Sequence, residues 1–156
     1  MYKRQTKFQL GSLHHIGLVV PDLDVSVAYY RDVMGVSEIS DLYQIPDRGL
    51  KIRFVNLLTG RVELIEPDKE TSSLYKFIEE NPKGGQHHIC FEVENMREAT
   101  SHMEDQGVRL LSEPFMGILG SPIVFLNPDD TQGVLIELME TPLLGTHTLG
   151  PSSRAG

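Results

Sequence analysis

A tripeptide, His-His-Ile, occurs twice in this chain, and an acidic segment follows each copy at nearly the same distance. The copies are His14-His15-Ile16 and His87-His88-Ile89, and the acidic segments are Val62-Glu63-Leu64 and Ile136-Glu137-Leu138. The two histidine phrases lie 73 residues apart, and the two acidic segments lie 74 residues apart. Self-similarity at a fixed period indicates an internal duplication, so we expect two equivalent modules.

Composition and charge narrow the classes of protein to consider. The 156 residues are enough for one domain with a real core, and no apolar run approaches the ~20 residues that span a membrane. A net charge of −8 argues against nucleic acid as a partner, because phosphate binding needs clustered Lys and Arg. An anionic small ligand would instead need local cations such as Lys51, Arg53 or Arg61.

The start of the chain and its cysteine content bear on the cellular compartment. The polar, basic start of the chain lacks the apolar stretch of a secretory signal. Cys90 is the single cysteine and cannot form an internal disulfide, so the fold does not need an oxidising compartment. We therefore expect a cytoplasmic protein without a membrane partner, or a mitochondrial matrix protein if the source is eukaryotic.

Hydrophobic periodicity predicts the same order of elements, β-α-β-β-β, in both halves. Asp22 and Asn95 are the expected N-caps of the two helices. We expect an N-terminal tail (1–12), a first module (13–70), a linker helix and loop (71–85), a second module (86–142) and a C-terminal tail (143–156). The expected elements are strands 13–20, 36–40, 50–57 and 61–65 with helix 23–34, linker helix 72–80, and strands 87–93, 108–112, 122–126 and 134–139 with helix 96–106.

These elements predict an α+β fold in which each helix covers one face of a curved four-stranded sheet. Two such sheets side by side would form a trough. Alternation along a strand divides its residues between the two faces. The more aliphatic set, with His14 in one strand and His87 in the other, should pack under the helix. The opposite face then receives four polar side chains, namely His15, Glu63, His88 and Glu137.

Two imidazoles and two carboxylates are a suitable donor set for one divalent metal ion. Without a thiolate, such a set favours a five- or six-coordinate ion such as Co²⁺, Mn²⁺, Ni²⁺ or Zn²⁺. Open coordination positions would admit a substrate oxygen, so that the metal would act as a Lewis acid. Cys90 would share the inner face, where a small buried hydrophobic role is favoured.

The chain resembles the vicinal oxygen chelate superfamily, which includes glyoxalases and bleomycin-resistance proteins, and within it the methylmalonyl-CoA epimerases. The matching stretches are Leu13–Leu23, Phe54–Leu57, Val62–Pro67, Gly85–Val93 and Gly133–Leu138. The resemblance implies paired βαβββ modules, usually dimeric, whose metal is held by His15, Glu63, His88 and Glu137. It also implies that the substrate is methylmalonyl-CoA, whose 2R and 2S forms would be interconverted by proton abstraction at C2. A divalent metal, above all Co²⁺, would stabilise the enolate.

The same resemblance implies one acid/base on each face of the substrate carbon. Glu137 would be one, and an acidic residue in the loop before the third strand would be the other. Where that family has a glutamate, this chain has Asp47, with Gln44 upstream. Either residue is therefore a candidate for the second acid/base. The usual His-Pro before the last turn is Asn127-Pro128 here. A glyoxalase I-like lactoylglutathione lyase and a non-catalytic binding protein are the alternatives.

Overall fold

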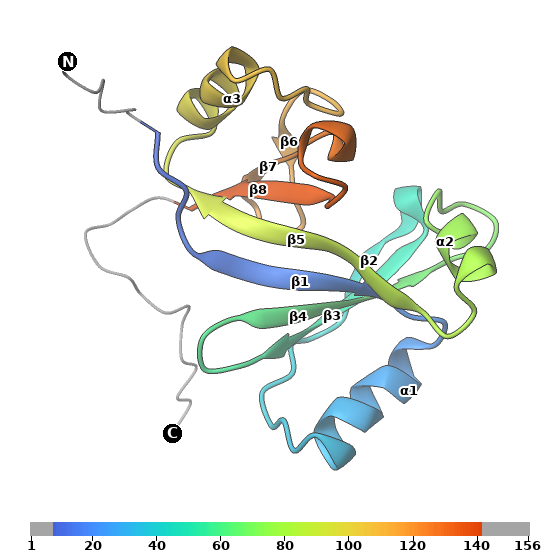
Figure 1. The fold of residues 1–156 in the computed structure, drawn as a ribbon. Coiled ribbons are helices and arrows are strands. Elements are labelled where there is room, and N and C mark those ends of the chain that lie inside the picture. Colours follow the sequence, from blue (N-terminus) through green and yellow to red (C-terminus); the bar gives the residue numbers. More distant parts are fainter. Residues whose placement is uncertain (1–7, 142–156) are drawn as a thin grey trace.

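The computed structural model describes residues 8–141, and its strands form one eight-stranded sheet with the order β2-β3-β4-β1-β5-β8-β7-β6 (Figure 1). The expected C-terminal tail and the first seven residues of the expected N-terminal tail lie outside this range. In chain order the elements are β1 (Leu13–Val19), α1 (Leu23–Ala28) with a π-helical turn (Tyr29–Val33), β2 (Tyr43–Ile45), a 3₁₀ turn (Pro46–Arg48), β3 (Leu50–Asn56), β4 (Arg61–Pro67), α2 (Tyr75–Glu80), β5 (Gly85–Val93), α3 (Met96–Asp105), β6 (Phe115–Met116), β7 (Pro122–Phe125), a 3₁₀ turn (Pro128–Asp130) and β8 (Ile136–Glu140).

The sheet repeats its own topology about the centre. The first half has the order β2-β3-β4-β1, and the second half has the equivalent order β6-β7-β8-β5. The strands β1 and β5 pair antiparallel in the middle, and each pairs in parallel with the acidic strand of its own half, β4 or β8. This arrangement confirms the predicted α+β fold of two similar modules joined into one curved sheet.

Each half also builds its core in the same way, and Figure 1 shows α1 and α3 on opposite sides of the molecule. Leu23 and Val27 of α1 pack with Leu64 of β4, and Met96 and Ala99 of α3 pack with the core of the second half. The second core is completed by Val93, Val124, Leu126 and Leu138. Leu23, Val27, Met96 and Ala99 are buried, as their helical spacing predicts, whereas Met34, which the same spacing places on the apolar face, is 58 % exposed.

Two side chains fix the start of each helix. Asp22 accepts a hydrogen bond from the Val25 amide, and Asn95 accepts one from the Glu98 amide, both at 3.0 Å, as N-caps do. A glutamate from the end of the acidic strand adds a second contact to each helix. The Leu23 amide donates to Glu66 at 2.9 Å, and the Met96 amide donates to Glu140 at 2.8 Å. The caps were predicted from the sequence, whereas the glutamate contacts were not.

The short strands expected at 36–40 and 108–112 are wrong. Each stretch makes only an isolated bridge, Ile39 to Val55 and Leu110 to Leu126. The hydroxyl of Ser40 accepts the hydrogen bond of the Phe54 amide at 2.8 Å, so a side chain interrupts the ladder beside β3. The regular edge strands are β2 and β6, which come later in the chain.

The segment just before β1 is packed rather than loose. Phe8 stacks on His102 of α3 with ring centroids 4.8 Å apart, and the Gly11 amide donates to the Glu92 carbonyl at 2.9 Å. Phe8 and Gly11, which were predicted to lie in an N-terminal tail, therefore contact the second half of the fold. Within residues 8–141, none of the helices has the length and apolar character needed to cross a bilayer.

We expect Leu138→Ala to lower the free energy of unfolding by about 2–5 kcal/mol, because this fully buried side chain fills the centre of the second core. Leu58→Ala is the matched control. Its side chain is 92 % exposed, so the change should stay within about 0.5 kcal/mol. Chemical denaturation of the two variants beside the wild type measures both values. Equal effects of the two substitutions would contradict this description of the core.

Candidate metal centre

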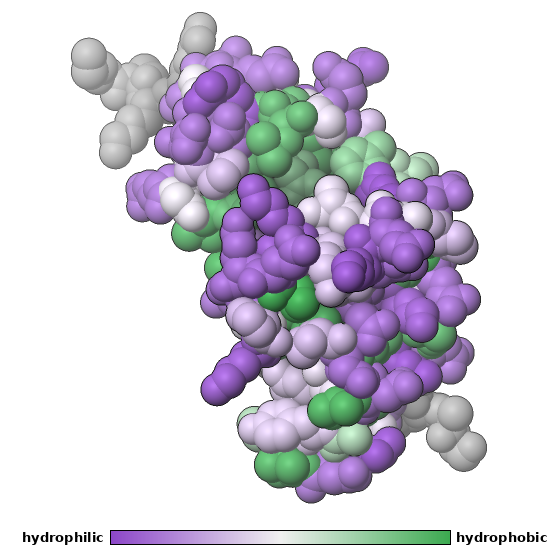
Figure 2. All heavy atoms as spheres, turned by 90° about the vertical axis from the view of Figure 1, so that its right-hand side faces the viewer, coloured by the Kyte–Doolittle hydropathy of each residue, from purple (hydrophilic) through white to green (hydrophobic). Residues whose placement is uncertain are grey.

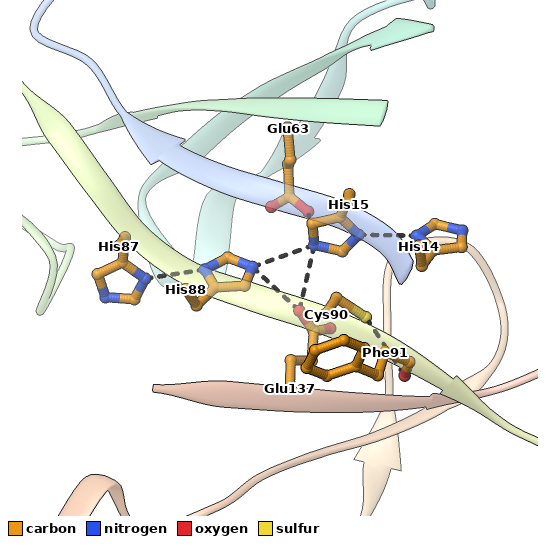
Figure 3. Close-up of polar contacts among 8 residues, drawn as sticks. All are labelled: His14, His15, Glu63, His87, His88, Cys90, Phe91 and Glu137. Atoms are coloured by element: carbon orange, nitrogen blue, oxygen red, sulfur yellow. Dashed lines mark hydrogen bonds and ion pairs between the residues drawn. The ribbon is translucent and has the colours of Figure 1, made fainter. Parts of the chain in front are cut away.

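Four ionisable side chains meet at the centre of the sheet, one from each of four adjacent strands. They are His15 of β1, Glu63 of β4, His88 of β5 and Glu137 of β8, and none is more than 8 % exposed. One donor atom from each side chain lies within 4.8 Å of the donor atoms of the other three. Figure 3 shows these side chains converging from the two halves of the sheet. The structure thus brings together the four residues singled out by spacing and parity.

Hydrogen bonds among the four cannot account for their packing. The Nε2 atom of His15 lies 2.8 Å from Glu63 Oε2, 3.1 Å from His88 Nε2 and 3.3 Å from Glu137 Oε2. A ring nitrogen carries at most one hydrogen, so it cannot donate along three directions at once. The Nε2 atom of His88 also lies 3.0 Å from the same oxygen of Glu137.

A shared cation accounts for these separations better. Donor atoms bound at ~2.1 Å to one metal, and at right angles to each other, are about 3 Å apart. The observed separations of 2.8 to 3.3 Å match such edges. The donor set contains nitrogen and oxygen but no sulfur, which suits a divalent ion of intermediate hardness. The residues present therefore fit a metal, and Glu63 and Glu137 would supply its negative charge.

The electrostatics of the metal-free cluster are strongly coupled. Burial alone would lower the pKa of His15, but its hydrogen bonds to Glu137 and Glu63 outweigh burial and raise this pKa to about 9. Burial alone would raise the pKa of Glu137, but the bonds to His15 and His88 lower it to about 2. At neutral pH the metal-free site thus holds a proton on His15 and a carboxylate at Glu137.

The first histidine of each pair does not occupy the place that alternation predicted. His14 and His87 were expected under the helices, on the far face of the sheet. Instead the Nδ1 atom of His14 lies 2.7 Å from Nδ1 of His15, and that of His87 lies 2.9 Å from Nδ1 of His88 (Figure 3). Strict alternation fails because the pairing of β1 with β5 shifts register at both places.

Two equivalent positions beside the histidines differ between the halves. A Cβ placed on Gly17 would overlap the His88 ring, so the absence of a side chain here makes room for that imidazole. The equivalent residue of the second half is Cys90, which pairs with His15 across the strands. Cys90 is fully buried beside Ile123 and Met139, and burial raises the pKa of its thiol. It is a small buried residue, as expected.

A cavity of about 760 Å³ opens from the four side chains. Its wall is mostly apolar, and Figure 2 shows hydrophobic side chains lying in patches between hydrophilic ones on the face that carries α2. The apolar lining includes Ile45, Leu50, Ile52, Phe115, Ile118 and Phe125. A largely apolar recess with polar groups at one place is typical of a small-molecule site.

Two charged residues of the Pro46–Arg48 turn also line this cavity. One is Asp47, whereas Gln44 is exposed on β2 and is absent from the lining. The other is Arg48, whose guanidinium lies 4.6 Å from the centre of the Phe115 ring. The cations suggested from the sequence, Lys51 among them, do not line the cavity. Arg48 was not among the cations predicted from the sequence, although its position next to Asp47 in a Pro-Asp-Arg-Gly turn was a usable signal.

Comparison with known proteins places the chain in a family. Residues 14–125 match the model of the Glyoxalase/Bleomycin resistance protein/Dioxygenase superfamily. The match covers more than half of the chain and includes three of the four donors, so the chain belongs to this superfamily. Its curled sheet of two similar modules is consistent with that membership.

Several similar proteins within the superfamily are methylmalonyl-CoA epimerases, which are isomerases. The ethylmalonyl-CoA/methylmalonyl-CoA epimerase of Cereibacter sphaeroides is 40 % identical over 131 residues, covering 83 % of this chain and 97 % of that protein. The mitochondrial methylmalonyl-CoA epimerase of Mus musculus is 39 % identical over 132 residues, covering 84 % and 74 %. A variant of Streptomyces coelicolor methylmalonyl-CoA epimerase, in complex with 2-nitronate-propionyl-CoA, superposes with a TM-score of 0.78 at 31 % identity, covering 85 % and 99 %.

Gly17→Ala should weaken divalent-metal binding by at least about tenfold, because the added methyl group displaces the ring of His88. Gly60→Ala is the control, since a Cβ there meets nothing within 4 Å. Titration of each metal-free variant with Co²⁺ gives the two dissociation constants. If the two alanine variants bind equally well, the close approach of Gly17 to His88 has no bearing on the site.

Metal binding should release about one proton per chain at pH 7, because His15 with its pKa of about 9 must lose a proton before it can ligate. The apparent affinity should rise about tenfold per pH unit from pH 7 and level off above pH 9. Glu137, with a pKa of about 2, stays ionised throughout and adds no slope. Isothermal titration in two buffers of different protonation enthalpy measures the proton count. An affinity that is constant from pH 7 to pH 9 would refute this assignment.

Proposed function

We propose that this chain is a metal-dependent epimerase that interconverts the 2R and 2S forms of methylmalonyl-CoA. The observation that carries the proposal is the convergence of four buried donors at a largely apolar cavity. The similarity to epimerases of this substrate supports the assignment of the acyl-CoA. The proposed ligands are His15, Glu63, His88 and Glu137.

The chemistry requires both the cation and the cavity. The hydrogen on C2 of methylmalonyl-CoA lies between a thioester and a carboxylate and is too weakly acidic to leave unaided near neutral pH. A divalent ion at the four donors would polarise the substrate oxygens and stabilise the negative charge that develops as this proton leaves. The apolar walls exclude water and so strengthen such electrostatic stabilisation.

Inversion at one carbon needs a proton acceptor and a proton donor on opposite faces. We assign these roles to Asp47 and Glu137. Asp47 lines the same cavity as the four donors, which supports it over Gln44, whose amide is no base. Glu137 is ionised at neutral pH and so able to accept a proton, although its low pKa makes it a weak base until its bonds to the histidines loosen. Arg48 is the proposed cavity-wall cation for an anionic substrate.

Three further assignments belong to the same proposal. Co²⁺ is the proposed native metal, with Mn²⁺, Ni²⁺ and Zn²⁺ as the other ions that this donor set accepts. The proposed assembly is a homodimer. The proposed compartment is the cytoplasm, or the mitochondrial matrix in a eukaryotic source.

The direct test is exchange of the C2 hydrogen of methylmalonyl-CoA for deuterium in D₂O, followed by proton NMR. The Co²⁺-loaded protein should catalyse exchange, the chelator-treated protein should not, and added Co²⁺ should restore it. Formation of lactoylglutathione from its hemithioacetal, without exchange on methylmalonyl-CoA, would favour the lyase instead. Binding of the CoA ester without any turnover would favour the non-catalytic alternative.

Asp47→Asn should slow deuterium exchange from one of the two stereoisomers by about 10²- to 10⁴-fold, because it removes the base on one face only. Gln44→Ala is the control, because Gln44 is exposed and does not line the cavity. This variant should catalyse exchange at the wild-type rate. Separate rates for the 2R and 2S substrates, measured in D₂O, make the comparison. Unchanged rates with both stereoisomers for Asp47→Asn would remove this residue from the mechanism.

A further inference from the structure

The two histidines that precede the proposed ligands make the same contact in both halves of the molecule. His14 approaches His15 with 2.7 Å between their Nδ1 atoms, and His87 approaches His88 with 2.9 Å. The two ring pairs are nearly perpendicular, at 79° and 88°. These distances are those of a hydrogen bond between two ring nitrogens, so in each pair one Nδ1 donates and the other accepts.

A register shift in β1 produces the first of these contacts. Leu13 pairs with Phe91 of β5. His15, two residues further along β1, pairs with Cys90, which is only one residue from Phe91. His14 is therefore the extra residue of a bulge-like irregularity. Such an irregularity re-aims a side chain that alternation would send to the other face.

A second shift, on the other strand, produces the second contact. Gly17 of β1 pairs with His88, and Leu18 pairs with Gln86. One step along β1 thus corresponds to two steps along β5, and the extra residue is His87. The two irregularities fall on equivalent residues of the two copies of the His-His-Ile phrase. The two halves thus share the same irregularity and the same contact between neighbouring imidazoles.

The direction of each hydrogen bond follows from the site. A histidine that ligates through Nε2 must leave that nitrogen without a hydrogen, so its neutral ring carries the hydrogen on Nδ1. His15 and His88 direct Nε2 to the centre of the cluster. Their Nδ1 atoms are then donors, and the Nδ1 atoms of His14 and His87 are acceptors.

We propose that His14 and His87 are positioning residues that accept the Nδ1 hydrogens of His15 and His88 and so hold both rings in the orientation and tautomer that metal binding requires. The inference rests on the metal site proposed above and adds two residues behind it. Groups of this kind typically contribute 10- to 100-fold to metal affinity.

One competing use of His14 is a soft-metal site with His15 and Cys90, whose donor atoms also lie within 4.8 Å of one another. The equivalent set around His87 and His88 has Gly17 in place of Cys90 and so has no sulfur donor. The contact between the two histidines is present there too. The feature shared by both halves is thus the pair of imidazoles. We therefore favour the positioning role.

The test compares substitutions that remove or keep an acceptor. His14→Leu and His87→Leu should each weaken Co²⁺ binding by about 10- to 100-fold. His14→Asn and His87→Asn should stay within a few-fold of the wild type, because the amide oxygen lies close to the place of Nδ1. His102→Leu, on α3 away from the site, is the control. Equal affinity in the leucine variants and the wild type would overturn the inference.

The second readout is the tautomer of each ring in the Zn²⁺-loaded protein, from nitrogen-15 NMR. We expect the hydrogen on Nδ1 of His15 and His88, with nitrogen–nitrogen couplings across the two hydrogen bonds. A hydrogen on Nδ1 of His14 or His87 would overturn the inference even if the leucine variants failed to fold. A thiolate-to-Co²⁺ absorption band abolished by Cys90→Ala would also overturn it, in favour of the soft-metal site.

The two proposals fail in distinguishable ways. A wild-type protein that binds neither Co²⁺ nor Zn²⁺ would overturn the metal site and this inference together. Normal wild-type binding with equal binding by the leucine variants would overturn the inference alone. Retained affinity in the asparagine variants, together with loss in the leucine variants, would support the acceptor role and not a merely space-filling one.

Discussion

Four buried ionisable side chains in close contact occupy the centre of this fold. Two carboxylates and two imidazoles meet with donor atoms about 3 Å apart, at positions almost closed to solvent. Removing such groups from water costs several kcal/mol for each ion unless a partner compensates. One proton on His15 compensates only part of two carboxylate charges, whereas a divalent cation with neutral histidines compensates both. The cluster is therefore expected to be more stable with a metal than without.

The duplication explains where the cluster lies. Each half contributes one histidine from its first strand and one glutamate from its last strand, so neither half holds a complete donor set. The four strands concerned are the central ones, because β1 and β5 pair with each other and with the acidic strand of their own half. The same pairing places the cavity against the centre of the sheet, with the Pro46–Arg48 turn contributing to its wall.

Much of this arrangement could be predicted from the sequence, because it depends on the regular spacing of residues in strands and helices and on the internal repeat. The alternation of residues in strands placed Glu63 and Glu137 on the correct face, and Asp22 and Asn95 were correctly predicted as the N-caps of the two helices. The conclusions that failed concern breaks in those periods. Alternation cannot show that His14 is the extra residue of an irregular strand pair, since the register depends on the partner strand. The edge strand of the first half was misplaced for a related reason, because Ser40 uses its side chain in place of a ladder bond.

A crystal structure of the Co²⁺-loaded protein, with anomalous data collected at the cobalt edge, would locate the metal directly. We expect one strong anomalous peak per chain, within coordinating distance of Nε2 of His15 and His88 and of a carboxylate oxygen of Glu63 and of Glu137. A peak bound elsewhere, or no peak while these four side chains keep their present positions, would show that the four residues are not the metal ligands.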